Sequence, residues 1–470
     1  MKRRWMQPKE YSVMSIRGML LVGLIAGGFS SWAQNEYVTG TRSNYDEVTT
    51  TARDRGKLLL EKEVGEFANG NTYVRLSKDV AADNVDFMLP TKLTSDSLME
   101  ALITIFTLKR NGAHQVRVHM AGRAARVEVT DLPEFESIAV DNWLKAAGAD
   151  ELIVGGTRRS LRRYPIAKAQ AARGRPAIVQ INHSRLARSL GDLLDIEVLH
   201  RLSRENIRGR AIQLVGPAPE PVNASFFRVL MTAVKIHRLG PASLELLTPY
   251  LPYSRSDKVD SPGTAVVGKL IASLIEASGV TSVSFVRSHA AQAVGFFNIP
   301  ADNISGRKTI NRYLKSLGVE TVTSPDTGFE KDATLFADEN SMLLSVINKQ
   351  RDPVTGKLRI VGISGAEHVK GRKVVIIDDE TASGGTLAEA AEYLVNLGAE
   401  EVYAVVTHLA GHAKSALNSP HIKQIIVTNT LPVTAESPKL KVLDISEELA
   451  RNLRLFRKSA RTLICDGALE

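Results

Sequence analysis

One acidic, glycine-containing stretch combines residue types that suit the binding of a phosphorylated sugar. Asp378 and Asp379 directly follow the apolar run 374–377, and a short polar turn follows them. The turn consists of Ser383, Gly384, Gly385 and Thr386. Glycines let backbone N–H groups approach an anion, and a helix that starts there adds partial positive charge. The stretch therefore predicts a loop that holds a terminal phosphate, with two carboxylates that accept hydrogen bonds from the sugar diol.

A buried strand and a helix must position this loop. Residues 374–377 are a continuous β-branched run, which is typical of a buried parallel strand. Residues 387–397 have helical spacing, and Gly398 suits the end of that helix. The alternative is an ordinary turn whose acids are merely solvated. Neither a Walker A sequence nor a dinucleotide fingerprint occurs here, so those nucleotide folds lack support.

Length and composition narrow the class of protein. The chain has 470 residues, 44% hydrophobic and 24% charged, which indicates a folded protein of about three domains. Its single cysteine, Cys465, excludes a disulfide framework and a cysteine-rich zinc site. The net charge of +9 fits anionic ligands. Because basic residues are not interleaved with aromatic ones in any single block, we expect no nucleic-acid partner.

The N-terminus differs from the rest of the chain. Basic residues precede the apolar run 19–29, and small residues follow at Ser31 and Ala33, as in a secretory signal. The alternative is a disordered extension or a later start at Met14. The run is too short to span a bilayer, and we expect no membrane span elsewhere. Chemistry on phosphorylated sugars favours the cytoplasm, whereas a functional signal in residues 1–33 would mean export.

The loop resembles the phosphoribosyl-pyrophosphate signature of type I phosphoribosyltransferases. Five further stretches resemble the ribose-phosphate pyrophosphokinase (phosphoribosyl pyrophosphate synthetase) family, in family order and covering about 177–457. They are residues 249–258, 288–300, 324–328, 347–351 and 427–432. The resemblance implies an α/β fold of tandem phosphoribosyltransferase-like domains with mainly parallel sheets. It also implies transfer of the diphosphoryl group of ATP to ribose 5-phosphate, which gives phosphoribosyl pyrophosphate and AMP.

The resemblance also assigns roles to individual residues. Lys349 and Arg351 become the cations of the transition state, although they could equally be surface charges on a solvated loop. His289 and Asp326 become ligands for Mg²⁺ and the ATP phosphates, the alternatives being a packing histidine and a turn residue. The ribose 5-phosphate site becomes Asp378, Asp379, Ala382, Ser383, Gly384, Gly385 and Thr386.

Two residues depart from the family pattern. Arg287 stands where the family has an acid two residues before the histidine, and a cation there would weaken metal binding unless it points away. Ala382 stands where the family synthetases usually carry a third acid. The second departure removes one contact with the sugar and does not change the class.

The N-terminal type of domain of this family is predicted to occur twice. The order of motifs from residue 63 to residue 154 recurs from residue 197 to residue 285, although two generic strand–helix units could mimic such a repeat. The predicted division is an N-terminal segment, two N-type domains and a phosphoribosyl-binding domain. Their ranges are 1–40, 45–155 for copy one, 177–300 for copy two, and 301–460.

The two copies retain different parts of the family's ATP site. Copy one has Phe67, Asn69 and Asn71, which resemble the family's adenine-binding Phe-Ser-Asp-Gly-Glu turn with both acids made amides. Copy two has Arg255, Ser256 and Asp257, which resemble the Arg-Gln-Asp segment. In the family, neighbouring subunits supply these two parts. We therefore expect copy one to take the neighbour's place within one chain, unless it is only a packing domain.

Three functions follow from these patterns. The first is a ribose-phosphate diphosphokinase that binds ATP and ribose 5-phosphate with Mg²⁺ and, like its family, forms a homo-oligomer. The second is a catalytically weak relative that regulates or scaffolds an active synthetase, which Arg287, Ala382 and the split adenine site favour. The third is a phosphoribosyltransferase that consumes the diphosphate. The retained pair of aspartates and the retained cations Lys349 and Arg351 favour the first.

Overall fold

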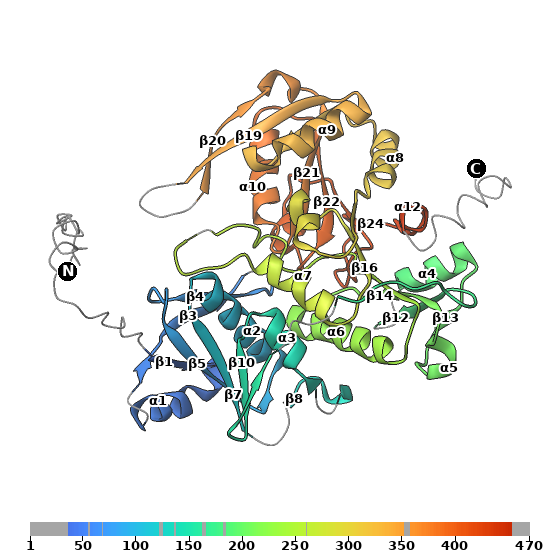
Figure 1. The fold of residues 1–470 in the computed structure, drawn as a ribbon. Coiled ribbons are helices and arrows are strands. Elements are labelled where there is room, and N and C mark those ends of the chain that lie inside the picture. Colours follow the sequence, from blue (N-terminus) through green and yellow to red (C-terminus); the bar gives the residue numbers. More distant parts are fainter. Residues whose placement is uncertain are drawn as a thin grey trace, which may run out of the picture. The chain divides into compact units, whose positions relative to one another are not determined.

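Three large sheets, flanked by helices, make up the part of the chain that the structure describes (Figure 1). The structure is a computed structural model. It describes residues 36–54, 57–67, 69–121, 126–135, 138–161, 166–181, 185–259, 261–351 and 358–453. The signal-like segment 1–33 and Cys465 lie outside these ranges.

The first sheet has six strands and carries its helices on both faces. Its spatial order is β11 (Thr157–Ser160), β10 (Glu151–Val154), β7 (Gln115–Met120), β5 (Asn84–Leu89), β1 (Glu36–Gly40) and β2 (Leu58–Leu59), and only β11 is antiparallel to its neighbour. Tyr37 and Val38 face opposite sides, as neighbours in a strand must. Val38 packs on α1 (Tyr45–Asp54), and Tyr37 joins the core of α2 (Ser95–Arg110) and α3 (Asp141–Ala146).

The second sheet is fully parallel. Its order is β13 (Val198–Leu199), β12 (Ala177–Gln180), β14 (Ala211–Val215), β15 (Ser243–Leu247), β16 (Ser282–Val286) and β17 (Ala301–Ile304). Helices α6 (Val222–Arg238) and α7 (Val267–Ala277) cover one face, and α4 (Arg185–Leu194) and α12 (Ser446–Asn452) cover the other. Because both faces are buried, these strands are almost continuously apolar.

The two six-stranded sheets have the same strand order, although the last strand is antiparallel to its neighbour in the first sheet and parallel in the second. In each, the first strand connects through a helix to the edge strand beside it, and the next three strands run in order toward the other edge. The main difference lies before the third strand. There the first sheet has the hairpin β3 (Lys62–Glu66) and β4 (Thr72–Leu76), and the second has only α5 (Arg204–Ile207).

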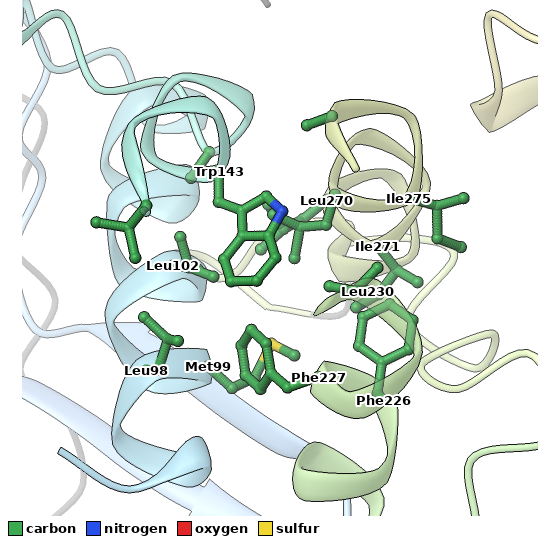
Figure 2. Packing of buried hydrophobic residues seen from close by; sticks show 14 of the residues in the cluster. Leu98, Met99, Leu102, Trp143, Phe226, Phe227, Leu230, Leu270, Ile271 and Ile275 are labelled. Carbon is green, nitrogen blue, oxygen red and sulfur yellow. The ribbon is translucent and has the colours of Figure 1, made fainter. Parts of the chain in front are cut away.

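Helices from the two sheets pack against each other in one shared core (Figure 2). Trp143 of α3 is 2% exposed, and its ring centroid lies 5.5 Å from that of Phe227 of α6. The indole N–H donates to Ser278 Oγ at 3.1 Å, so its one polar group is satisfied. This packing joins the first two predicted domains into one unit.

The third sheet has seven strands and carries the predicted phosphate loop. Its order is β20 (Leu358–Ser364), β19 (Leu343–Arg351), β18 (Thr321–Ser324), β21 (Lys373–Thr381), β22 (Glu401–Leu409), β23 (Gln424–Thr428) and β24 (Leu440–Leu443), with only β20 antiparallel. Helices α8 (Arg307–Leu317) and α9 (Glu330–Asn340) cover one face, and α10 (Gly385–Asn396) and α11 (Lys414–Asn418) cover the other. Val374 and Ile376 face the second pair, and Val375 and Ile377 face the first.

Shorter elements complete the described chain. They are β6 (Lys92–Leu93), β8 (Arg126–Val129), β9 (Ile138–Ala139) and the 3₁₀ turns η1 (Arg42–Asn44), η2 (Pro133–Phe135), η3 (Ala291–Phe296), η4 (Thr327–Phe329) and η5 (Ala366–His368). None of the described helices is both long enough and apolar enough to cross a membrane.

The predicted α/β class with mainly parallel sheets is confirmed. The helix expected over 387–397 is α10, and Gly398 follows it with φ +90°. Two boundaries need correction. Strand β1 starts at Glu36, inside the predicted N-terminal segment, because its residues pair with β5 and are mostly buried. Strand β21 runs to Thr381 because the acids also pair with β22, so the turn is shorter than expected.

Candidate active site

The phosphate loop connects the end of β21 to α10. Gly384 adopts φ +79° directly before the helix, and a Cβ there would lie 2.7 Å from the Cβ of Ala416, so the turn requires glycine. Ser383, Gly385 and Thr386 are exposed, whereas the Ala382 carbonyl accepts from the Ala413 N–H. The loop therefore presents its hydroxyls and the start of a twelve-residue helix to solvent, as anion binding requires.

The twin aspartates lie at the end of β21, beside a histidine from the second sheet. Asp379 is 3% exposed, and its Oδ2 lies 2.6 Å from Nδ1 of His289. Burial opposes ionisation of Asp379, but the hydrogen bond and charge of His289, together with Asp378 and Arg255, outweigh it and hold the pKa of this carboxyl below its usual range. The same bond raises the pKa of His289. Burial, then the charge of Asp379, raises the pKa of Asp378.

The β3–β4 hairpin is seated against residues that follow strands of the second sheet. The Thr72 N–H donates to Tyr253 Oη at 3.1 Å, and Asn223 Nδ2 donates to Thr72 Oγ1 at 3.0 Å. At the other end of β4, the Leu76 N–H donates to the carbonyl of Gly263 at 2.9 Å. These bonds join residues about 150 to 190 positions apart, so the hairpin belongs to the same site as the segment after β15.

The three predicted adenine-site residues of the hairpin differ in exposure. Phe67 is 53% exposed, and its ring centroid lies 5.2 Å from that of Tyr73, so one face of the ring is available for stacking. Asn69 and Asn71 are buried. Asn69 Nδ2 donates to Glu380 Oε1 at 3.2 Å, and Asn71 Oδ1 has no hydrogen-bond partner among the described residues.

Arg255, in the loop after β15, contacts the same glutamate as Asn69. Its Nε lies 2.9 Å from Glu380 Oε1, and its side chain is 51% exposed. The predicted ATP residues Ser256 and Asp257 play more local roles. Ser256 Oγ accepts from the Val267 N–H at 3.1 Å and so caps α7, and Asp257 Oδ2 accepts from Gln292 Nε2 at 2.9 Å. Among the described residues, Arg255 is therefore the one predicted ATP residue of this loop with a side-chain contact to strand β21.

The predicted catalytic cations lie on β19, which is a strand rather than a polar loop as far as Arg351. The Lys349 side chain is 6% exposed, and its Nζ lies 3.5 Å from Glu389 of α10. It is therefore packed against the helix that the phosphate loop opens. Arg351 pairs with Leu358 in the ladder of β19 and β20, and its side chain lies outside the described part.

The two predicted metal ligands, His289 and Asp326, each make one side-chain hydrogen bond within the described part of the chain. His289 donates through Nδ1 to Asp379, which leaves Nε2 on the exposed side, as in carboxylate–histidine–metal arrangements. Asp326 Oδ1 accepts from the Phe329 N–H, so Oδ2 remains for a ligand. The described residues contain no ready cluster of three or more ligating side chains. Mg²⁺ commonly takes one or two protein ligands plus substrate phosphates.

Arg287, the departure from the family pattern, is directed toward η4, the turn that Asp326 caps. Its guanidinium lies 5.1 Å from the ring centroid of Phe329 and 4.0 Å from Asp332, both on the η4–α9 side. Burial lowers the pKa of Arg287, and its two terminal nitrogens lack hydrogen-bond partners among the described residues. The backbone adopts φ +36°, which strains a residue other than glycine.

A buried histidine links the loop-bearing sheet to the second sheet. His408 of β22 pairs with Glu380 in register and is 2% exposed. Its Nε2 donates to the Val286 carbonyl at 2.9 Å, and Nδ1 lies 2.9 Å from Thr430 Oγ1. Both ring nitrogens are engaged as in a neutral imidazole. Burial lowers the pKa of His408 to about 4.

Sequence comparison identifies the family. The ribose-phosphate pyrophosphokinase of Wolinella succinogenes is 32% identical over 283 residues, which cover 57% of this chain and 90% of that protein. Ribose-phosphate pyrophosphokinase A of Dictyostelium discoideum is 34% identical over 258 residues, 53% of this chain and 80% of that protein. The chain belongs to the ribose-phosphate pyrophosphokinase family.

Two domain models of this family match the chain. The N-terminal domain of ribose phosphate pyrophosphokinase matches two separate stretches, 39–121 and 181–279. The phosphoribosyl synthetase-associated domain matches 319–462. The crystal structure of phosphoribosylpyrophosphate synthetase from Mycobacterium smegmatis matches with a TM-score of 0.55 and 27% identity, over 61% of this chain and all of that one.

Sequence reasoning missed two residues of this candidate site. Glu380 is 4% exposed and contacts both Asn69 and Arg255. Its position between an acid pair and a threonine gave no reason to separate it from ordinary loop acids. Tyr253 lies within the motif 249–258, which gives it no role of its own, although its hydroxyl accepts from the Thr72 N–H of the hairpin. The available signal for Glu380 was its place in a strand whose residues are mostly buried, where an unpaired acid is rare.

Proposed function

We propose that this chain transfers the diphosphoryl group of ATP to ribose 5-phosphate, with a nucleotide site assembled from both N-type copies of one chain. The observation that carries the proposal is the seating of the copy-one hairpin on the loop after β15, next to Arg255 and the phosphate loop. The family's two halves of an ATP site thereby meet within a single polypeptide. Family membership supports the reaction class.

In this proposal the exposed face of Phe67 stacks on adenine, and the loop from Ser383 to Thr386 holds the 5-phosphate. Asp378 and Asp379 accept from the ribose diol and orient its anomeric hydroxyl. Arg255, together with Lys349 and Arg351, offsets the charge of the transferred group, since such transfer depends on positioning and charge neutralisation.

Magnesium would supply further neutralisation of the phosphates when bound, with His289 and Asp326 as its protein ligands. The His289–Asp379 bond would fix the imidazole so that Nε2 faces the metal. The matched N-domain stretches and the matched strand orders also support our proposal that the chain contains a duplicated N-type domain. We further propose a homo-oligomer that acts in the cytoplasm, where these substrates occur.

AMP release from ATP, Mg²⁺ and ribose 5-phosphate, measured with residues 35–470, tests the reaction. We expect turnover that Lys349→Ala reduces by about 100-fold or more, because a transition-state cation is lost. The matched control is Lys315→Ala on exposed α8, which should retain full activity. Folded wild-type protein that releases no AMP would reject the proposed reaction, and release of diphosphate with an added base would indicate a phosphoribosyltransferase.

The split adenine site has its own test in two single variants. Phe67→Ala and Arg255→Ala should each weaken ATP binding by about tenfold, since base stacking and a charged contact are each worth about 1–3 kcal/mol. Tyr45→Ala, which removes a similarly exposed aromatic ring of copy one (51% against 53%), serves as control. Unchanged ATP affinity in Phe67→Ala would reject the proposed role of copy one.

A second candidate function rests on two specific observations. The buried Glu380 already neutralises Arg255, and Arg287 replaces an acid beside the metal ligands. Both changes fit a relative that binds phosphoribosyl ligands and regulates an active synthetase. Calorimetry separates the two functions, because a regulatory chain would bind ribose 5-phosphate while releasing no AMP.

A further inference from the structure

Glu380 lies where strand β21, the β3–β4 hairpin and the loop after β15 come into contact. It belongs to β21, two residues after Asp378, and is 4% exposed. The hairpin reaches it through Asn69 and the loop after β15 through Arg255. A buried carboxylate is costly unless it is paired, and these two contacts supply the pairing.

Both partners use the same oxygen of Glu380. Oε1 accepts from Asn69 Nδ2 at 3.2 Å and lies 2.9 Å from Arg255 Nε. Contact through Nε leaves the two terminal nitrogens of the guanidinium for another ligand, and half of the Arg255 side chain is exposed. Asp379 and Asp378 also lie within electrostatic range of Arg255, so the guanidinium stands between the hairpin and the sugar loop. Guanidinium nitrogens in that place suit a phosphate group.

The same geometry explains why residue 69 is an amide. Asn69 donates to Glu380 and lies 3.5 Å from Tyr250 Oη, in a buried environment. An aspartate at 69 would place two carboxylates within hydrogen-bonding distance, which is strongly unfavourable away from water. The amide at 69 and the acid at 380 are therefore complementary.

We propose that Glu380 is a positioning residue for the nucleotide, which aims Arg255 at the phosphates of ATP and ties the copy-one hairpin to the sugar loop. The inference rests on the proposed function, because it assumes that ATP binds between the hairpin and Arg255. Glu380 itself touches neither substrate. Its removal should therefore weaken ATP binding while leaving ribose 5-phosphate binding unchanged.

Calorimetric titration of the folded chain with ATP and, separately, with ribose 5-phosphate tests this role. Glu380→Ala should raise the ATP dissociation constant by about tenfold or more, as expected for loss of a charged contact. Glu380→Gln keeps an acceptor oxygen and should lose about threefold. Glu392→Gln on exposed α10 is the matched control and should bind both ligands as wild type does.

A double-variant cycle tests the link to the hairpin. Asn69→Asp alone should weaken ATP binding by about tenfold through carboxylate repulsion. The double variant Asn69→Asp with Glu380→Gln should recover to within about threefold of wild type, because the swapped pair is again complementary. Purely additive losses in the double variant would overturn the proposed link.

Other outcomes also decide the matter. ATP affinity of Glu380→Ala within twofold of wild type would overturn the positioning role while leaving the proposed reaction intact. Equal losses for ATP and ribose 5-phosphate would overturn it as well, since they would mean that Glu380 merely supports the loop. A folded wild-type chain that binds no ATP would instead refute the proposed function, and this inference with it.

Discussion

Acid should destabilise this chain through His408. The ring is buried between two sheets with both nitrogens engaged, and burial lowers its pKa to about 4, against an ordinary value of 6.5. Between these values the unfolded chain binds a proton that the folded chain excludes. Stability is therefore fully present above pH 6.5 and falls as the pH drops toward 4. The two pKa values differ by about 2.5, and a difference of one in pKa corresponds to about 1.4 kcal/mol, so the full loss of stability is about 3 kcal/mol.

By pH 5 the loss from His408 should be about 2 kcal/mol. Urea unfolding at pH 7 and pH 5 measures it, with His408→Asn as the variant that lacks the titrating ring. The wild type should lose about 2 kcal/mol more than His408→Asn between the two pH values. His114→Asn, which removes an exposed histidine, should behave as wild type does. Equal acid losses in wild type and His408→Asn would refute the reasoning.

Three further predictions concern packing, charge and the loop. Trp143→Ala should destabilise the shared helical core by about 3–5 kcal/mol in urea unfolding, and a loss below 1 kcal/mol would contradict the packing in Figure 2. Burial, opposed by Glu100, lowers the pKa of Lys62 to about 8, so stability should rise by about 3 kcal/mol from pH 8 to 10.5. Lys62→Met should abolish that rise, and its persistence would exclude this lysine as the source. Gly384→Ala should weaken ribose 5-phosphate binding by about tenfold or more, because its Cβ would collide with Ala416; unchanged calorimetric affinity would argue against this loop.

The sequence allowed the phosphate-loop region to be predicted because its signals are local. Residues 374–377 alternate between two covered faces of the third sheet, so every one is apolar, and the helix that follows has its own spacing and end signal. Such patterns depend only on neighbours in the chain. The matching strand orders of the first two sheets follow from the same kind of local pattern, repeated.

The remaining features depend on contacts between distant residues. Nothing near Glu380 in the sequence shows that Asn69 and Arg255 will reach the same oxygen, since the three positions are far apart in the chain. The polar neighbours of Lys349 favour a solvated loop, but pairing with β20 makes that stretch a strand. The guanidinium of Arg287 packs on the ring of Phe329, 42 positions later in the chain. The sequence pattern does not reveal this contact.

The covalent connection between the hairpin and the loop after β15 has a practical meaning. Subunits that complete one another's sites lose them when they separate, and their turnover per chain falls at low concentration. Here Thr72 and Tyr253 belong to one polypeptide, so dilution does not separate them. A chain built in this way keeps the hairpin and the loop after β15 at a constant effective concentration.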